Sequence, residues 1–144
     1  MKYRMSLAAM VIVAVLVVAA AAYGNAKNSM QPAHVYYGTV VSGDHPDKLV
    51  TLHNGTGATQ KIDTVAVSGS GGYVFTLAAN TPILAESGLP RCKPGLVLPA
   101  GARCAIDVRL HTLRPGWFRS VLSVVYVEGW FNSSELRANV VVAP

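Results

Sequence analysis

The residues of this 144-residue chain that could carry chemistry are two cysteines, Cys92 and Cys104, together with four histidines and seven acidic residues. Thiol catalysis would need an activating base or a Cys-x-x-Cys pair, and a zinc site would need four closely spaced ligands. Neither pattern occurs. The acids are dispersed, and no Gly-x-Ser-x-Gly, His-Glu-x-x-His or phosphate-binding loop is present. The sequence therefore predicts a protein that is not an enzyme, with no catalytic residue, no cofactor and no metal site.

The compartment is predicted by residues 1–26, which have the order of a targeting segment. Lys2 and Arg4 precede an uncharged apolar run over residues 7–22, and small residues follow up to Ala26. This is the pattern of a secretory signal peptide. The apolar run is also close to the ~17–25 residues that span a bilayer, so a retained membrane anchor is the alternative. Both alternatives place residues 27–144 outside the cytoplasm.

Export changes the interpretation of the cysteines, because an even, small number of them in an oxidising compartment usually forms bridges. Cys92 and Cys104 flank a loop that contains Pro94 and Pro99. We predict a structural disulfide between them, in preference to a reactive or metal-bound pair.

The elements that position these residues are predicted to be strands. Short runs rich in Val, Ile, Thr, Tyr and Phe alternate with Gly, Pro, Asn, Asp and Ser clusters, and no helical periodicity is sustained. The pattern predicts an all-β fold, a seven-stranded antiparallel immunoglobulin-like sandwich over residues 35–144, preceded by a linker at residues 27–34 and the N-terminal apolar helix. The predicted strands are 35–41, 48–53, 61–67, 73–78, 103–111, 117–127 and 135–142, with a short extended piece at 96–98.

Alternation along the strands predicts which side chains form the core. In residues 104–111, one face carries Cys104, Ile106, Val108 and Leu110, and the other is predicted to face solvent. The last strand is predicted to bury Leu136, Ala138, Val140 and Val142. The strand at 117–127 differs, because its second face is also apolar, with Val121, Val125 and Val127. A strand that is apolar on both faces is either covered on both or offers a contact surface.

The order of several motifs resembles a known family. The chain carries "VTLHNGTGATQKIDTVAVSG", then "LVLPAGARCAIDVRL", then "RPGWFRSVLSVVY". This succession resembles the bacterial choice-of-anchor D domains, which are similar to the ASH or Hydin-type immunoglobulin-like modules and related to the major sperm protein fold. The family positions correspond to Leu52, Asn54, Gly57, Cys92, Leu98, Gly101, Cys104, Ile106, Val108, Pro115 and Gly116. The turn after Asn54 carries one glycine, Gly55, beyond the family pattern.

The resemblance implies a bacterial binding or assembly module without an active site, in the periplasm or at the cell surface, and attached to the inner membrane if residues 7–22 are retained. From residue 27 on, ten Lys or Arg residues and seven acids are scattered along the chain. No basic patch indicates nucleic-acid binding.

The candidate partner-binding residues are Val121, Val125, Val127, Trp130 and Phe131. We predict Trp130 and Phe131 at the turn between the last two strands, where they either pack on the protein's own body or contact a partner. The predicted function is an exported, non-enzymatic protein-interaction or assembly module of a bacterial envelope or surface structure, with self-association as one variant. The alternative is a periplasmic ligand- or metal-binding module.

Overall fold

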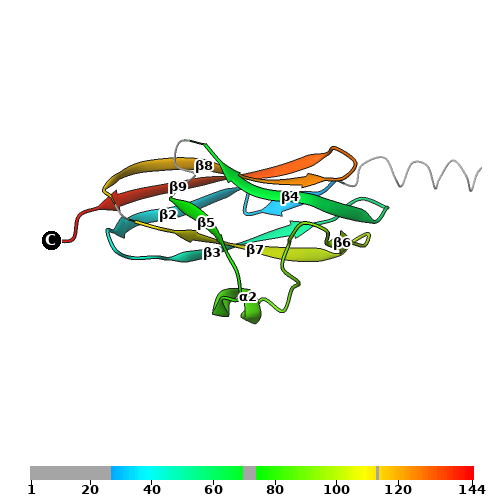
Figure 1. Cartoon of the computed structure of the whole chain (residues 1–144), viewed down its shortest axis with the longest axis horizontal. Coiled ribbons are helices and arrows are strands. Elements are labelled where there is room, and N and C mark those ends of the chain that lie inside the picture. The colour runs from blue at the N-terminus through cyan, green and yellow to red at the C-terminus, as the bar shows by residue number, and fades with distance from the viewer. Residues whose placement is uncertain (1–26, 70–73, 113) are drawn as a thin grey trace, which may run out of the picture.

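The computed structural model describes residues 27–69, 74–112 and 114–144, which form a sandwich of two β-sheets (Figure 1). One sheet has four strands in the order β1 (Ser29–Gln31), β3 (Asp47–His53), β7 (Arg103–Leu110) and β5 (Phe75–Ala78). The other has five, in the order β2 (His34–Val41), β9 (Phe131–Val141), β8 (Gly116–Tyr126), β4 (Gln60–Ser68) and β6 (Val97–Leu98). The immunoglobulin-like sandwich predicted from the sequence is therefore confirmed.

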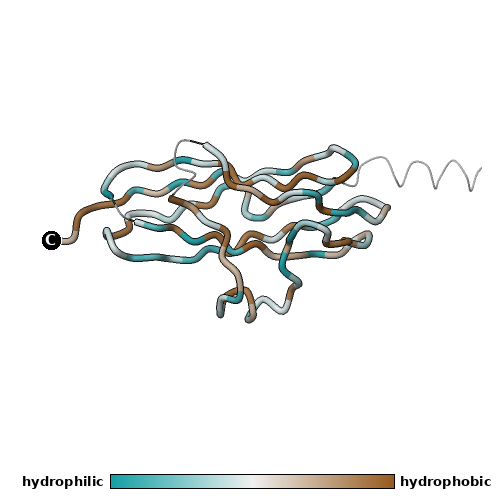
Figure 2. Tube along the Cα trace, viewed as in Figure 1, coloured by the Kyte–Doolittle hydropathy of each residue, from teal (hydrophilic) through white to brown (hydrophobic). Residues whose placement is uncertain are grey.

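The core lies between the sheets and is built by alternation along each strand. Figure 2 shows hydrophobic and hydrophilic residues interleaved along the strands of both layers. With one exception, the predicted inner residues of β3, β7, β8 and β9 are buried: Val50, Leu52, Cys104, Ile106, Val108, Leu110, Leu122, Val124, Tyr126, Leu136, Ala138 and Val140. Val142 is the exception. It lies beyond the end of β9 and is exposed, because no strand holds it over the core.

The strand count and the pairing differ from the prediction. The described residues contain nine strands rather than seven, and β2 pairs with β9 in parallel, so the five-stranded sheet is not fully antiparallel. Residues 27–34, predicted as a linker, contain β1, which pairs with β3 at the edge of the four-stranded sheet. After Gln31 the chain crosses to the other sheet as β2. β1 has only three residues, too few for an alternating pattern to predict it.

A short helix, α2 (Pro82–Glu86), was also missed within the connection predicted to be irregular. Thr81 is its N-cap. Pro82 follows in the first turn, where a backbone N–H would have no partner within the helix, so proline is tolerated there. The helix packs on β3 and β7 at the outer side of the four-stranded sheet (Figure 1). As a result, Ala105 and Asp107 are buried, although alternation predicted an exposed face there.

The remainder of the connection closes the side of the sandwich. Cys92 and Cys104 form the predicted disulfide, and the Cys92 amide donates a hydrogen bond of 2.8 Å to the Ala105 carbonyl. The chain then crosses to the second sheet, where Gly95 donates to the Ile62 carbonyl at 2.8 Å and β6 pairs with the start of β4. The disulfide thus ties this connection to β7 of one sheet, and backbone hydrogen bonds tie it to β4 of the other.

No helix among the described residues is long and apolar enough to cross a membrane. The predicted signal or anchor segment, residues 1–26, lies outside the described residues.

Candidate interaction surface

Three of the five predicted partner-binding residues lie on the outer face of the five-stranded sheet. Val125 of β8 is paired with Phe131 of β9 on one side and with Thr64 of β4 on the other. Val121 is paired with Glu135 and Ser68 in the same way. The inward neighbours of these residues on β8 fill the core, so the two-faced apolar character predicted for this strand is confirmed. We call Val121, Val125 and Phe131 the apolar strip.

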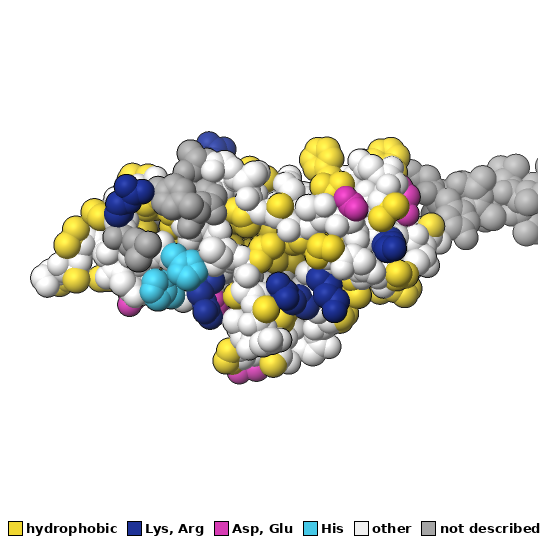
Figure 3. Space-filling model, viewed as in Figure 1, with side chains coloured by type: hydrophobic (Ala, Val, Ile, Leu, Met, Phe, Trp, Pro, Cys, Tyr) yellow, Lys and Arg dark blue, Asp and Glu magenta, His cyan; other side chains and the backbone are white. Residues whose placement is uncertain are grey.

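Val127 and Trp130 lie at the turn that joins β8 to β9. The Gly129 amide donates to the Tyr126 carbonyl at 2.8 Å, and the Tyr126 amide donates to the Trp130 carbonyl at 2.9 Å. Gly129 has a φ of 88°, a conformation that favours glycine. Val127 is 58% exposed, and Trp130 and Phe131 are each 70% exposed. Among the described residues nothing packs over these rings, and hydrophobic side chains project at this end of the molecule in Figure 3.

A cluster of charges borders the apolar strip. The Glu135 carboxylate contacts Arg137 at 2.7 Å, His34 at 3.2 Å and the guanidinium of Arg119. The hydrogen bond from Arg137, followed by that from His34 and the charges of both arginines, holds the pKa of Glu135 below its usual value. Two arginines against one carboxylate leave this part of the face positively charged.

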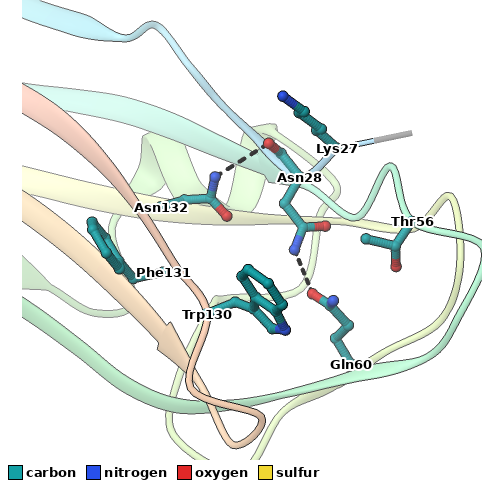
Figure 4. A pocket seen from close by; sticks show the side chains of 7 residues that line it. All are labelled: Lys27, Asn28, Thr56, Gln60, Trp130, Phe131 and Asn132. Atoms are coloured by element: carbon teal, nitrogen blue, oxygen red, sulfur yellow. Dashed lines mark hydrogen bonds between the residues drawn. The ribbon is translucent and has the colours of Figure 1, made fainter. Parts of the chain in front are cut away.

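A hollow of about 370 Å³ opens beside Trp130, and Figure 4 shows the residues around it. The rings of Trp130 and Phe131 point to opposite sides of their strand, with Trp130 toward Asn28 and Gln60. The Asn28 side-chain amide donates to the Gln60 side chain, and the Asn132 side chain donates to the Asn28 carbonyl at 3.2 Å. The remaining lining residues are Lys27 and Thr56. Trp130 therefore lies beside the point where the described chain begins, and the Phe131 ring points away from it.

Gly55 and Asn54 determine where the described chain enters the sandwich. A Cβ on Gly55 would lie 2.1 Å from the carbonyl oxygen of Lys27, so only glycine admits the incoming chain here. This close approach accounts for the glycine that is additional to the family pattern. Asn54 is fully buried, and its side-chain amide donates to the carbonyls of Ala58, Leu98 and Pro99 at 2.9 to 3.0 Å. The turn was predicted from the sequence, but this side-chain network was not.

A second pair of exposed aromatic residues lies toward the other end of the same face. Trp117 of β8 is 73% exposed, and Tyr36 of β2 is opposite Arg137 in the ladder. Together with His34 and Val35 they line a shallow depression. The nine residue steps from Trp117 to Tyr126 separate the two aromatic ends by about 30 Å of strand.

Among the described residues, the charges of Asp47, Asp107 and Arg109 interact with one another, and His111 interacts with Asp47. No three His, Cys, Asp or Glu side chains in the part of the chain that the structure describes are close enough to hold a metal ion. The rings of His45 and His111 are in contact with centroids 5.0 Å apart, away from His34. Asp107 is buried and accepts a hydrogen bond from Thr81, and burial raises its pKa. Asp107 lies beneath α2 and does not face an open cleft.

No protein-family model matches the sequence, and no curated protein matches it either. Solved structures do match. The ASH/PapD-like domain 7 of human CEP192 superposes with a TM-score of 0.56 at 13% identity, over 83% of this chain and 88% of that one. The fold is that of the ASH/PapD-like immunoglobulin-like domains. The resemblance predicted from the motifs is thereby confirmed at the level of fold.

Two larger proteins contain a similar body. A family 123 glycoside hydrolase of Clostridium perfringens matches with a TM-score of 0.57 at 9% identity, over 83% of this chain and 28% of that one. The VesB protease of Vibrio cholerae matches with a TM-score of 0.52 at 13% identity, over 78% of this chain and 31% of that one. In both, this ASH/PapD-like chain corresponds to less than a third of the matched protein. At these identities the likeness concerns the fold alone.

Proposed function

We propose that this ASH/PapD-like chain is an exported, non-enzymatic module that binds a protein partner in a bacterial envelope or surface assembly. The partner docks on the outer face of the five-stranded sheet, with the apolar strip of Val121, Val125 and Phe131 at the centre and Val127 and Trp130 at the edge. The observation that carries the proposal is the exposure of Phe131, which is 70% exposed although it pairs with Val125 in the last pair of the β8–β9 ladder, next to the turn. Exposed aromatic residues beside aliphatic ones are typical anchors of protein interfaces.

The two outer faces of the sandwich differ in a way that supports this choice. On the four-stranded sheet, α2 covers β3 and β7 and buries Leu84, Ala105 and Asp107. On the five-stranded sheet no described segment covers β8 and β9, and their outer side chains remain accessible. The chain therefore covers one apolar surface itself and leaves the other for a partner.

The charge beside the apolar strip indicates the chemistry of that partner. Arg119 and Arg137 remain largely exposed while they share the single carboxylate of Glu135. A complementary surface would place apolar side chains on the strip and acidic side chains near the arginines. Such complementarity contributes to orientation and association rate more than to affinity.

The proposal is tested by the size of the native complex in mild-detergent extracts of cells that produce the protein. The double substitution Val121→Ser with Phe131→Ser removes the apolar strip, and both residues are exposed enough that the free energy of unfolding should change by about 1 kcal/mol or less. We expect the wild-type chain to migrate in a complex and the double variant to migrate as a monomer. Val142→Ser, a change at an exposed valine outside the strip, is the control. A wild-type chain that is itself monomeric in the extract contradicts the proposal.

A further inference from the structure

The chain enters the sandwich at a fixed place beside the β8–β9 turn. Lys27 passes over Gly55, where a side chain would collide with its carbonyl oxygen at 2.1 Å, and Asn132 holds the next residue, Asn28, by a hydrogen bond. Lys27 and Trp130 line the same hollow (Figure 4). Whatever precedes Lys27 therefore starts within reach of Trp130.

The preceding sequence brings a membrane close to this end. Only four residues, 23–26, separate the apolar run at 7–22 from Lys27. Even when fully extended, the five steps from Ala22 to Lys27 span at most about 18 Å. If the apolar run remains in the bilayer, Lys27 is restricted to the headgroup layer or the water directly next to it.

The side chains at this end suit that position. Tryptophan is enriched at membrane–water interfaces, because its ring has an apolar body and a polar N–H. Trp130 is 70% exposed and Val127 is 58% exposed, and the ammonium group of Lys27 can meet anionic headgroups. Lys2 and Arg4 precede the apolar run, which favours a cytoplasmic N-terminus and places the sandwich on the opposite side.

We propose that residues 7–22 are retained as an anchor and that Val127, Trp130 and Lys27, here called the membrane tip, contact the lipid headgroups of the membrane that holds the anchor. The apolar strip then extends away from the bilayer along β8 and β9. The protein partner binds the strip next to the membrane, and Val127 and Trp130, at the edge of the proposed docking face, contact lipid in place of the partner. This contact needs export but not the partner, so lipid vesicles with the full chain test it separately from the proposed docking face.

The two tryptophans provide a matched pair for the test. Trp117 and Trp130 are almost equally exposed, at 73% and 70%, and lie about 30 Å apart along the sheet. Trp117→Phe leaves Trp130 as the only tryptophan, and Trp130→Phe leaves Trp117. The full-length variants are reconstituted into phosphatidylcholine–phosphatidylglycerol vesicles that contain brominated lipid, which quenches only tryptophans at the bilayer.

We expect brominated lipid to reduce Trp130 emission by roughly half and to leave Trp117 emission nearly unchanged. Aqueous acrylamide should quench Trp117 more strongly than Trp130 in the same vesicles. N-terminal sequencing of the cellular protein should find the chain intact through residues 7–22. Equal quenching of both tryptophans, no quenching of Trp130, or a mature protein that starts at Tyr23 or Lys27 overturns the proposal. If Trp130 is unquenched in vesicles but is shielded in the native complex, the tip belongs to the protein interface instead.

Discussion

Val125 and Phe131 lie directly opposite each other across β8 and β9, on the outer face of the five-stranded sheet. Cross-strand pairs of an aromatic and a β-branched residue stabilise a sheet even when they face solvent. Phe131 remains mostly exposed in this pair, so its contact with Val125 does not bury the ring. The pair therefore stabilises the sheet and is also part of the proposed docking surface.

The Cys92–Cys104 disulfide should account for a large part of the stability of the sandwich. It closes a loop with a sequence separation of 12, and both cysteines are buried. On the chain-entropy model, loss of a bridge of this size lowers the free energy of unfolding by about 3 kcal/mol. Urea denaturation with and without a reductant measures the difference. The variant Cys92→Ser with Cys104→Ser should be less stable by a similar amount and should no longer respond to the reductant; an unaltered urea midpoint on reduction would contradict this role.

Asn54 should be among the most sensitive polar positions. Its side-chain amide donates to three carbonyls, and its side-chain oxygen accepts from the Thr56 amide at 3.0 Å. Asn54→Ala leaves buried carbonyls without a donor and should lower the free energy of unfolding by roughly 2–4 kcal/mol. Asn139→Ala, on the outer side of β9, is a control that should cost much less. Equal losses in the two variants would show that the network around Asn54 does not hold the turn.

The ion pair between Asp47 and Arg109 should make stability depend on pH in the acid range. Arg109 donates two hydrogen bonds to the carboxylate, at 2.7 and 2.8 Å, which lower the pKa of Asp47 from its usual value of 3.8. A lowered folded-state pKa contributes stability that is fully present above pH 3.8 and is lost as the pH falls through the folded-state value. The pair is partly exposed, so its contribution to stability at pH 7 should be small.

The measurement is a double-mutant cycle with Asp47→Asn and Arg109→Gln, in urea at pH 7 and at pH 2.5. The coupling between the two substitutions should be present at pH 7 and smaller at pH 2.5. A coupling that is unchanged, or that grows on acidification, would contradict the assigned role of the carboxylate.

Local patterns in the sequence were sufficient to predict the inner faces of the sandwich. Alternation placed Cys104, Ile106, Val108 and Leu110 in the core, because a strand with one buried face repeats every two residues. Asp107 was predicted on the exposed side but is buried. The cause is α2, a five-residue helix too short to show a helical period.

Contacts between distant segments could not be predicted in this way. β1 pairs with β3, and β2 pairs in parallel with β9. Both pairings are set by contacts between distant segments, and neither produces a local sequence pattern. The sequence also left open whether Trp130 and Phe131 pack on the protein itself. The structure exposes both, because Phe131 continues the outer face of β9 and Trp130 lies at the end of the sandwich.

The most direct test of the proposed docking face is photo-crosslinking in cells. A benzoylphenylalanine replaces Phe131 in one variant and the exposed Lys48 of β3, on the opposite sheet, in another. The account predicts a discrete protein adduct from position 131, which Val121→Ser weakens, and no such adduct from position 48. No adduct at position 131, or the same adduct from both positions, would contradict the claim that the outer face of β8 and β9 binds a protein partner.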